Sequence, residues 1–314
     1  MTGNTPKSTN GPKAGRLTSY QPHARLFEAE RQRLYALAYR MLGSLSEAED
    51  VMQDAYVKWQ RTDLKPIKTP AAYLTTIVSR LCIDVMRRSR AARVIYPGPW
   101  LPEPVSDEMT EPFCPSAFGD PEGNTRQAES ISMAFLCLLE TLGPLERAVF
   151  ILKEAFDSEH IAIADTLEIT PAHSRQLLRR ARGKVKASDI DNAEKGESQQ
   201  LMEQFLIAAG TGNLEALHEL MSDDITAFSD GGGRASAALI PLVGKARVTT
   251  VLLHLVNKQE ATLAPEFKAA NGDIALVLWE GDAIHSSHTL EIRAHKIYRI
   301  FSTRNPDKLR FLKG

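Results

Sequence analysis

One short basic segment constrains the fold and function of this chain more than any other part of it. Residues 170–186, TPAHSRQLLRRARGKVK, carry six basic side chains and no acidic one, although the whole chain has a formal net charge of −1. At 100° per residue, Leu177, Leu178 and Val185 fall on one stripe of a helix, while Arg179 and its basic neighbours fall on the opposite stripe. The sequence therefore predicts a helix that packs through one face and presents cations on the other.

A second, shorter helix is predicted immediately before the basic one, over residues 158–167. Thr170 can accept a backbone N–H at the start of the basic helix, and Pro171 lacks the N–H that the first turn would leave unpaired. Glu168 lies in the tight connection between the helices, where a left-handed backbone would cost about 1 to 2 kcal/mol. Helix, short turn and basic helix form the helix-turn-helix pattern, whose second helix enters the major groove of DNA.

The alternative interpretation is that the basic helix is a solvated surface. Solvated helix faces usually pair acidic with basic side chains at a spacing of four residues, and this stripe contains no acidic residue. The upstream helix also has the length and spacing that a helix-turn-helix requires. We therefore favour nucleic acid over solvent as the partner of the basic face.

Composition predicts three domains, a tail and a linker in the 314 residues. Residues 1–22 are rich in Pro, Gly, Ser, Thr and Asn with almost no apolar side chains, which indicates a disordered tail. Residues 94–125 hold seven prolines together with apolar side chains such as Trp100 and Leu101, which indicates an extended linker docked on a surface. A further break lies near residues 187–198. The predicted domains are 23–93, 126–187 and 198–314.

Several classes of protein are excluded by the sequence. No apolar run resembles a signal peptide or approaches the 18 residues of a membrane span, so we expect a cytoplasmic protein with no membrane association. Cys82, Cys114 and Cys137 are odd in number and widely spaced, which argues against a disulfide framework and against a zinc site. We expect neither a metal nor a cofactor.

The first domain is predicted to be entirely helical. Its helices are expected at 25–42, from Ser46 to about residue 60, and from 70 to about 93, with Ser46 and Glu49 forming a capping box. The second helix is strongly acidic, and the third ends in a cluster of arginines. One interpretation is a plain three-helix bundle with solvated charges. In the other, the basic end binds nucleic acid and the acidic helix binds a protein partner.

The last domain changes to a pattern of helices followed by strands. Helices are expected at 198–209, 213–221 and 244–257, and strands at 224–229, 235–243, 262–270, 273–280 and 284–303, the last split near Ala294. Asn271, Gly272 and Asp273 predict a hairpin turn. Helices followed by a curved antiparallel sheet form an α+β cone.

At this point the residues show a family resemblance. The segments LAYRMLGSLSEAEDVMQDAYVKW (37–59), PAAYLTTIVSRLCIDVMRR (70–88) and SRQLLRRARGKVK (174–186) resemble regions two and four of extracytoplasmic-function bacterial sigma factors, in the same order and spacing. YPGPWLPEP (96–104), DGGGR (230–234) and NPDKL (305–309) resemble the subgroup with a fused SnoaL-like, NTF2-like C-terminal domain. The fold that this resemblance implies is multidomain, with two all-α DNA-binding domains and an α+β NTF2-like cone.

The resemblance also implies partners and site residues. A sigma factor directs RNA polymerase core to promoter DNA, and its acidic helix binds the clamp helices of the β′ subunit, here through Glu49, Asp50, Gln53, Asp54 and Trp59. The segment that melts and reads the −10 element corresponds to Tyr73, Arg80, Asp84, Arg87 and Arg88, although Arg80 stands where many relatives have asparagine. The −35 element would meet His173, Ser174, Arg175, Gln176 and Arg179 at base edges, and Arg180, Arg182, Lys184 and Lys186 at phosphates.

The C-terminal domain is expected to regulate the sigma factor in cis. The residues expected to carry that regulation between domains are Trp100, Leu101, Asp230, Gly231, Gly232, Gly233, Asn305, Pro306 and Asp307. Docking, rather than catalysis, is the expected mode of action.

An alternative function is an NTF2-like isomerase-type enzyme or small-molecule-binding module fused to a DNA-binding domain, with an unidentified ligand in the cone. Asp230, Asp282, His285 and His288 could be imagined as an acid/base site. However, His285 and His288 are three apart on a predicted strand, which sends them to opposite faces and argues against one shared metal. The ordinary role of Asp230 is to hold a turn that the following glycines permit.

Overall fold

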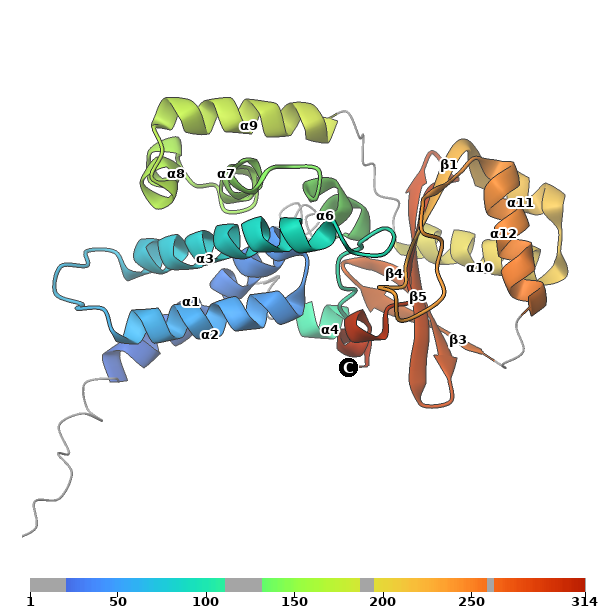
Figure 1. The fold of residues 1–314 in the computed structure, drawn as a ribbon, viewed down its shortest axis with the longest axis horizontal. Coiled ribbons are helices and arrows are strands. Elements are labelled where there is room, and N and C mark those ends of the chain that lie inside the picture. Colours follow the sequence, from blue (N-terminus) through green and yellow to red (C-terminus); the bar gives the residue numbers. More distant parts are fainter. Residues whose placement is uncertain (1–20, 111–131, 187–194, 259–262, 314) are drawn as a thin grey trace, which may run out of the picture.

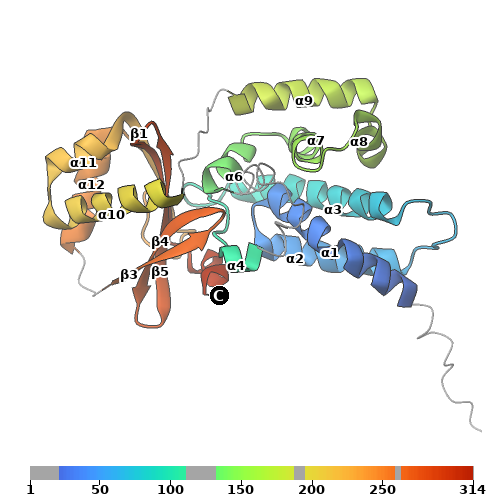
Figure 2. The same ribbon diagram turned by 180° about the vertical axis from the view of Figure 1, so that it is seen from behind.

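The computed structural model describes residues 21–110, 132–186, 195–258 and 263–313. Two helical domains pack together at one end of the molecule, and an α+β domain lies at the other (Figure 1). The chain ends between these two parts, beside the linker that leaves the first domain (Figures 1 and 2). Almost all of the predicted tail, the second half of the predicted linker and most of the predicted break near 187–198 lie outside the described residues.

Three long helices form the N-terminal domain: α1 (Gln21–Leu42), α2 (Leu45–Gln60) and α3 (Pro70–Arg93). Each buries an apolar stripe that includes Leu34, Val51 and Leu74. The fully buried Trp59 closes one end of this core and donates its indole N–H to the carbonyl of His23 at 2.9 Å. The predicted helical domain is confirmed, because the 3.6-residue spacing of apolar positions matches the buried faces.

Helix α2 begins differently from its prediction. Its N-cap is Ser44, whose hydroxyl accepts the backbone N–H of Glu47 at 3.1 Å. The expected capping box of Ser46 and Glu49 is therefore wrong. Both candidate caps are serines followed by glutamate three residues later, so the local pattern could not separate them.

A carboxylate from the linker completes the start of α2. Glu103 is only 6% exposed, and it accepts the backbone N–H of Leu45 at 2.8 Å and the Ser44 hydroxyl at 3.0 Å. It also accepts the backbone N–H and the hydroxyl of Ser46. An anion at a helix N-terminus is stabilised by unpaired N–H groups and by the helix dipole. The linker is thus joined to the first domain by a buried charge.

The helix-turn-helix domain consists of α6 (Met133–Leu139), α7 (Pro144–Glu154), α8 (His160–Leu167) and α9 (Pro171–Lys186), and a short helix α4 (Asp107–Thr110) precedes it. Glu168, between α8 and α9, has φ 53° and ψ 45°, so the helix-turn-helix forms although its turn adopts the costly left-handed conformation. The hydroxyl of Thr170 accepts the backbone N–H of His173 at 3.1 Å and caps α9 as expected.

One apolar core continues through both helical domains, from Leu37 of α1 to Ile151 of α7 and Leu178 of α9. A buried cation reinforces the join: Arg147 of α7 donates to the carbonyl of Met41 at 2.7 Å and pairs with Glu140 at 2.6 Å. Burial lowers the pKa of this guanidinium. The two domains therefore form one body in this structure.

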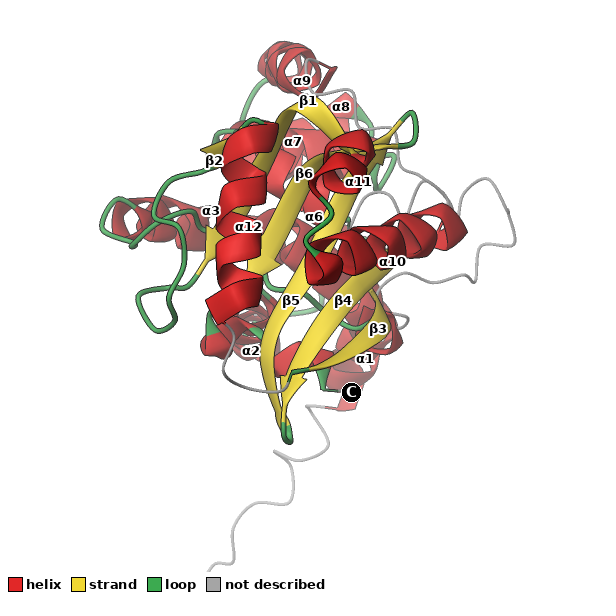
Figure 3. Ribbon diagram, turned by 90° about the vertical axis from the view of Figure 1, so that its right-hand side faces the viewer, coloured by secondary structure: helices red, strands yellow, loops and turns green. Residues whose placement is uncertain are grey.

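The C-terminal domain is a curved six-stranded sheet with helices on one face (Figure 3). Its elements are α10 (Lys195–Thr211), α11 (Leu214–Leu220), β1 (Met221–Asp230), β2 (Leu242–Val243), α12 (Lys245–Lys258), β3 (Ala264–Ala270), β4 (Asp273–Glu280), β5 (Ala283–Arg293) and β6 (Lys296–Thr303). The strand order is β2-β1-β6-β5-β4-β3. Two 3-10 turns, η2 (Pro306–Lys308) and η3 (Arg310–Leu312), follow β6 and lie between the domains.

The expected α+β cone is confirmed with two differences. The sheet is mixed rather than antiparallel, because β1 pairs in parallel with β6. The strand expected at 235–243 shrinks to Leu242 and Val243, and residues 235–241 form turns and loop. The hairpin at Asn271 and Gly272 is confirmed, with φ of 54° and 74° as a type I′ turn requires, and the split after β5 falls at Ala294 as expected.

Glu103→Ala should destabilise the folded chain by about 2 kcal/mol, because the N–H and hydroxyl donors at the start of α2 would stay buried without their acceptor. Urea unfolding monitored by circular dichroism measures this change. Glu108→Ala, at an exposed position of the same linker, is the matched control. Equal stability of the two variants would contradict the role given to Glu103.

Candidate DNA, polymerase and interdomain sites

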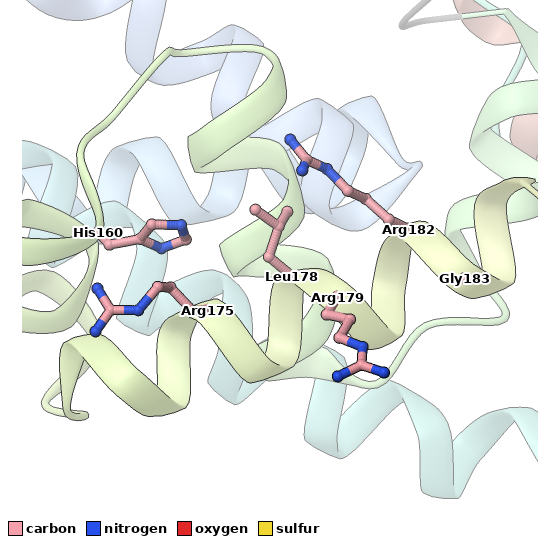
Figure 4. Close-up of a pocket in the computed structure, with 6 residues that line it drawn as sticks. All are labelled: His160, Arg175, Leu178, Arg179, Arg182 and Gly183. Atoms are coloured by element: carbon pink, nitrogen blue, oxygen red, sulfur yellow. The ribbon is translucent and has the colours of Figure 1, made fainter.

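The basic face of α9 borders an open cleft of about 540 Å3 lined by His160, Arg175, Leu178, Arg179, Arg182 and Gly183 (Figure 4). Leu177, Leu178 and Ala181 pack inward on the opposite stripe, as the periodicity predicted. His173, Arg175, Gln176 and Arg179 are exposed in the first turns of the helix. Their placement suits base reading, because the N-terminal part of a recognition helix reaches base edges.

The remaining cations of α9 differ in whether an acidic side chain already pairs with them. Arg182 pairs with Glu154 at 2.7 Å and Lys184 pairs with Glu146 at 2.6 Å, so acids of α7 already neutralise part of their charge. Arg180 is exposed and makes no ion pair among the described residues. Lys186 ends the helix, and its side chain lies outside the described residues.

One expected base-reading residue lies elsewhere. Ser174 is fully buried, and its hydroxyl hydrogen-bonds Nδ1 of His160 at 2.9 Å, so it cannot reach a base from this position. Helical spacing places Ser174 on the same stripe as the buried Leu177, Leu178 and Ala181, and the family resemblance overrode that signal.

The residues expected at the −10 element follow the face of α3. Tyr73 is half-exposed and Arg88 is exposed, while Asp84 lies 3.7 Å from Arg87 in an exposed pair. Arg80 differs from the rest, because it pairs with Glu168 at 2.9 Å and donates to the carbonyl of Thr166 at 3.2 Å. A side chain expected to meet the −10 element is thus bound to the turn of the helix-turn-helix.

The acidic helix α2 presents Asp50, Gln53 and Asp54 to solvent, with Glu49 half-exposed. Trp59 differs from its expected role, because it is fully buried in the core and has no surface to offer a partner. The exposed apolar residue of this face is Val57, with 44% of its surface accessible, which the sequence reading did not select.

A cleft of about 740 Å3 separates the start of α2 from the C-terminal turns, lined by Ser46, Glu49, Asp50, Glu103, Asn305, Pro306, Asp307, Lys308 and Arg310. Arg310 donates to the Ser46 hydroxyl and lies 3.9 Å from the Glu49 carboxylate. The last residues of the chain therefore border the acidic face of α2.

The expected interdomain residues meet at one buried carboxylate. Asp230, fully buried at the end of β1, accepts the Tyr96 hydroxyl at 2.6 Å and the backbone N–H of Leu101 at 2.9 Å. It also pairs with the ammonium group of Lys308 at 2.7 Å, while its backbone carbonyl accepts the N–H of Asn305 at 2.9 Å. Burial and the hydrogen bond to Asp230 raise the pKa of Tyr96, and burial lowers the pKa of Lys308.

Trp100 packs between two cations from different domains. The guanidinium of Arg93, at the end of α3, lies 3.4 Å from its ring centre, and the ammonium of Lys308 lies 4.0 Å away. Arg93 also pairs with Glu140 of the helix-turn-helix domain. Leu101 packs with Met133 and Ala134 of α6, so all three domains contact this stretch of the linker. Tyr96, Glu103 and Lys308 lie inside or beside the quoted motifs but were not selected from the sequence.

The glycine loop after Asp230 allows its backbone to lie close to the linker and to the C-terminal turn of the same domain. A Cβ on Gly232 would lie 2.2 Å from the Asn305 amide nitrogen, and one on Gly233 would lie 2.9 Å from the ring of Pro97. Both residues have positive φ. Beyond them, Arg234 and Asp307 form a two-point ion pair at 3.0 and 3.1 Å, so the second and third motifs are joined directly.

The histidines of β5 form a polar string rather than a metal site. The register of β4 and β5 shifts beside them, and the Ser286 hydroxyl hydrogen-bonds both His285 at 3.2 Å and His288 at 2.9 Å. The simple alternation argument placed them too far apart, because it ignored this irregularity. Burial and Arg304 lower the pKa of His288 to about 4, which favours neutral imidazole. Within the described ranges no group of three metal-ligating side chains occurs.

Comparisons with known proteins agree with this arrangement. The family models described as Sigma-70 region 2 and Sigma-70, region 4 match residues 26–92 and 132–185. The ECF RNA polymerase sigma factor SigJ of Mycobacterium tuberculosis (strain ATCC 25618 / H37Rv) is 30% identical over 293 residues, covering 90% of this chain and 91% of that protein. The probable ECF RNA polymerase sigma factor SigI of the same strain is 27% identical, covering 93% of this chain and 97% of that one.

A solved structure is similar along almost the whole length. The crystal structure of the M. tuberculosis extracytoplasmic function sigma factor SigJ has 28% sequence identity and a TM-score of 0.69, and it covers 93% of this chain and 99% of that chain. The similarity therefore includes the C-terminal domain as well as the two helical domains.

Arg179→Ala should weaken binding to duplex DNA by about 1 to 3 kcal/mol and relax the preference for one base pair, because the residue is expected to reach a base edge. Lys184→Ala should cost less and act on all sequences alike, since Glu146 already neutralises part of its charge. Fluorescence anisotropy on a series of single-base variants of the duplex measures both effects, with Lys258→Ala of α12 as the charge control. Equal, sequence-independent losses for Arg179 and Lys184 would show that the roles are misassigned.

Proposed function

The chain belongs to the extracytoplasmic-function RNA polymerase sigma factors, and we propose that its C-terminal domain holds its two DNA-binding domains in a closed state that must open at a promoter. RNA polymerase core and promoter DNA are the partners of such a factor. Among the described residues, no helix combines the length and apolarity needed to cross a membrane.

The contact between Arg80 and Glu168 carries this proposal. The −10 and −35 elements lie about 25 base pairs apart, or roughly 80 Å at ~3.4 Å per base pair. In the closed state an expected −10 residue lies 2.9 Å from a residue of the −35-binding helix-turn-helix. Two domains in contact cannot engage two elements at that separation, so the domains must part on the promoter.

The linker has the length to allow that separation once it is released. Residues 94–131 would span roughly 120 Å when extended at ~3.3 Å per residue. In the closed state this reach is not available, because Leu101 is bonded to Asp230 and Glu103 to the start of α2. Val105 and the buried Asn271 exchange two further hydrogen bonds of 2.9 Å. The C-terminal domain therefore acts by shortening the linker.

The polymerase surface that we propose is the exposed face of α2, with Asp50, Gln53, Asp54 and Val57 at its centre. Acidic side chains around an exposed apolar residue suit a basic partner that brings apolar side chains of its own. We propose that this partner is the clamp helices of the β′ subunit of RNA polymerase. Arg310 borders the same face, so docking of the C-terminal domain also limits access to it.

We propose no catalytic role for the C-terminal domain. A general acid or base needs a carboxylate within reach of a substrate, whereas Asp230 is fully buried and its side-chain oxygens are bonded to Tyr96, Leu101 and Lys308. Both carboxylate oxygens already have hydrogen-bond partners in the linker and the C-terminal turn, which suits a structural role.

Asp50→Lys combined with Asp54→Lys should weaken assembly with RNA polymerase core by at least about 30-fold, equivalent to about 2 kcal/mol, because two attractions become repulsions. Both side chains are exposed, so folding should be unchanged. Co-elution with core polymerase in size-exclusion chromatography and a competition titration measure assembly. Glu215→Lys with Asp224→Lys, on the C-terminal domain, makes the same change in net charge. Assembly equal to that control would refute the proposed surface.

Gly233→Ala should open the chain and raise promoter-dependent transcription several-fold, because the new Cβ would lie 2.9 Å from the Pro97 ring of the linker only when the domains are docked. Gly281→Ala is the matched control, since Gly281 also has positive φ but has open space around it. Transcription with purified core enzyme and small-angle scattering are measured on the same samples. Raised activity without any change in interdomain distances would remove docking as the cause, and lowered activity would contradict a closed inhibitory state.

A further inference from the structure

The cleft beside α9 contains one side chain from outside the recognition helix. His160 is the first residue of α8, and it lines this cleft together with Arg175 and Arg179 (Figure 4). The sequence reading assigned no role to it, because it lies outside the basic segment. Its position matters because the first helix of a helix-turn-helix crosses the DNA backbone while the second enters the groove.

A buried hydroxyl holds the imidazole in place. Ser174 is fully buried in α9, and its only described side-chain partner is Nδ1 of His160 at 2.9 Å. That bond occupies one ring nitrogen and leaves Nε2 for the cleft, where no partner for it is found among the described residues. When the hydroxyl donates to Nδ1, the neutral ring carries its proton on Nε2 and presents a donor.

The electrostatic setting selects the kind of ligand. Three arginines line the same cleft, and its lining contains no carboxylate. Arg182 is turned toward Glu154 of α7, so Arg175 and Arg179 supply the charge that is not already paired. A polar group that donates a hydrogen bond next to free guanidinium groups suits an anionic oxygen.

We propose that His160, oriented by Ser174, donates a hydrogen bond from Nε2 to a backbone phosphate that flanks the −35 element. This inference rests on the proposed promoter-binding role and deepens it. His160 is the contacting residue and Ser174 is its positioning residue. The contact fixes the depth and angle of α9 in the groove, while Arg175 and Arg179 read the bases.

Three properties separate this contact from the arginine contacts. A phosphate carries no sequence information, so His160→Ala should weaken a selected duplex and its shuffled version by the same factor, about 10-fold. A neutral donor displaces no counterion, so the slope of log affinity against log salt should stay unchanged, whereas Arg179→Ala should reduce it by about one. Ser174→Ala should weaken binding several-fold, and the double variant should bind no worse than His160→Ala.

The experiment uses the full chain, with anisotropy titrations of a fluorescent duplex that the wild type selects from a random library and of a shuffled duplex. His254→Ala, an exposed histidine of α12, and Ser79→Ala, a buried serine of α3 whose hydroxyl has no partner among the described residues, are the matched controls. Thermal unfolding shows that each variant is folded. Because α9 is exposed in the closed state, opening is not needed for this binding.

The proposal is supported if His160→Ala loses affinity equally on both duplexes at unchanged salt slope and Ser174→Ala adds nothing to it. It is overturned if His160→Ala binds within twofold of the wild type, if the loss is confined to the selected sequence, or if the two substitutions are additive. Transcription by wild-type holoenzyme on the selected promoter distinguishes failure of the His160 contact from failure of the promoter-binding role. Transcription that survives with an unaffected His160→Ala rejects only this contact, whereas a wild type that directs no transcription rejects the promoter-binding role itself.

Discussion

The buried carboxylate of Asp230 is the interaction on which the rest of the structure depends. A carboxylate removed from water is tolerated only when its oxygens are paired and hydrogen-bonded. Here the partners come from two separate segments, the linker through Tyr96 and Leu101 and the C-terminal turn through Lys308. Losing any one of them leaves a buried charge partly unpaired, so the segments are held together or released together.

Further contacts of the linker extend this interaction along the interface between the helical domains and the sheet. Its residues alternate between the two sides: Leu101 bonds the sheet, Glu103 bonds α2, and Val105 returns to Asn271 of the sheet. Trp100 fills the remaining space between cations of α3 and η2. The glycines after Asp230 serve the same interface, since a Cβ on Gly232 would lie 2.9 Å from the Tyr96 hydroxyl and one on Gly233 would lie 2.9 Å from the ring of Pro97, both in the linker. In the proposed regulation, docking of the linker on the sheet opposes the separation of the two DNA-binding domains that the promoter requires.

Much of the fold and part of the site could be predicted from the sequence, because their causes are local. The apolar spacing of α3, the cap at Thr170 and the break at Ala294 all depend on neighbouring residues. The motifs at residues 96–104, 230–234 and 305–309 were also recognised from the sequence, although their contacts with one another were only an expectation.

The remaining features depend on residues far apart in the sequence. The cap of α2 shifted to Ser44 because Glu103, 58 residues beyond Leu45, lies at its N-terminus. The family resemblance assigned Trp59 to a polymerase surface and Ser174 to a base edge, but both are buried. Helical spacing places each on the apolar stripe of its own helix, so here periodicity was the better guide. The parallel pairing of β1 with β6 likewise joins the two ends of the domain.

The most direct measurement of the central claim is the distance from α1 to α9, by electron spin resonance between labels at Glu28 and Ala172, in the free chain and in the polymerase–promoter complex. Cys114 and the partly exposed Cys137 are replaced for this purpose, while Cys82 is fully buried. The account predicts one narrow, short distance in the free chain and an increase of tens of ångströms in the complex. An unchanged short distance in an active promoter complex would contradict it.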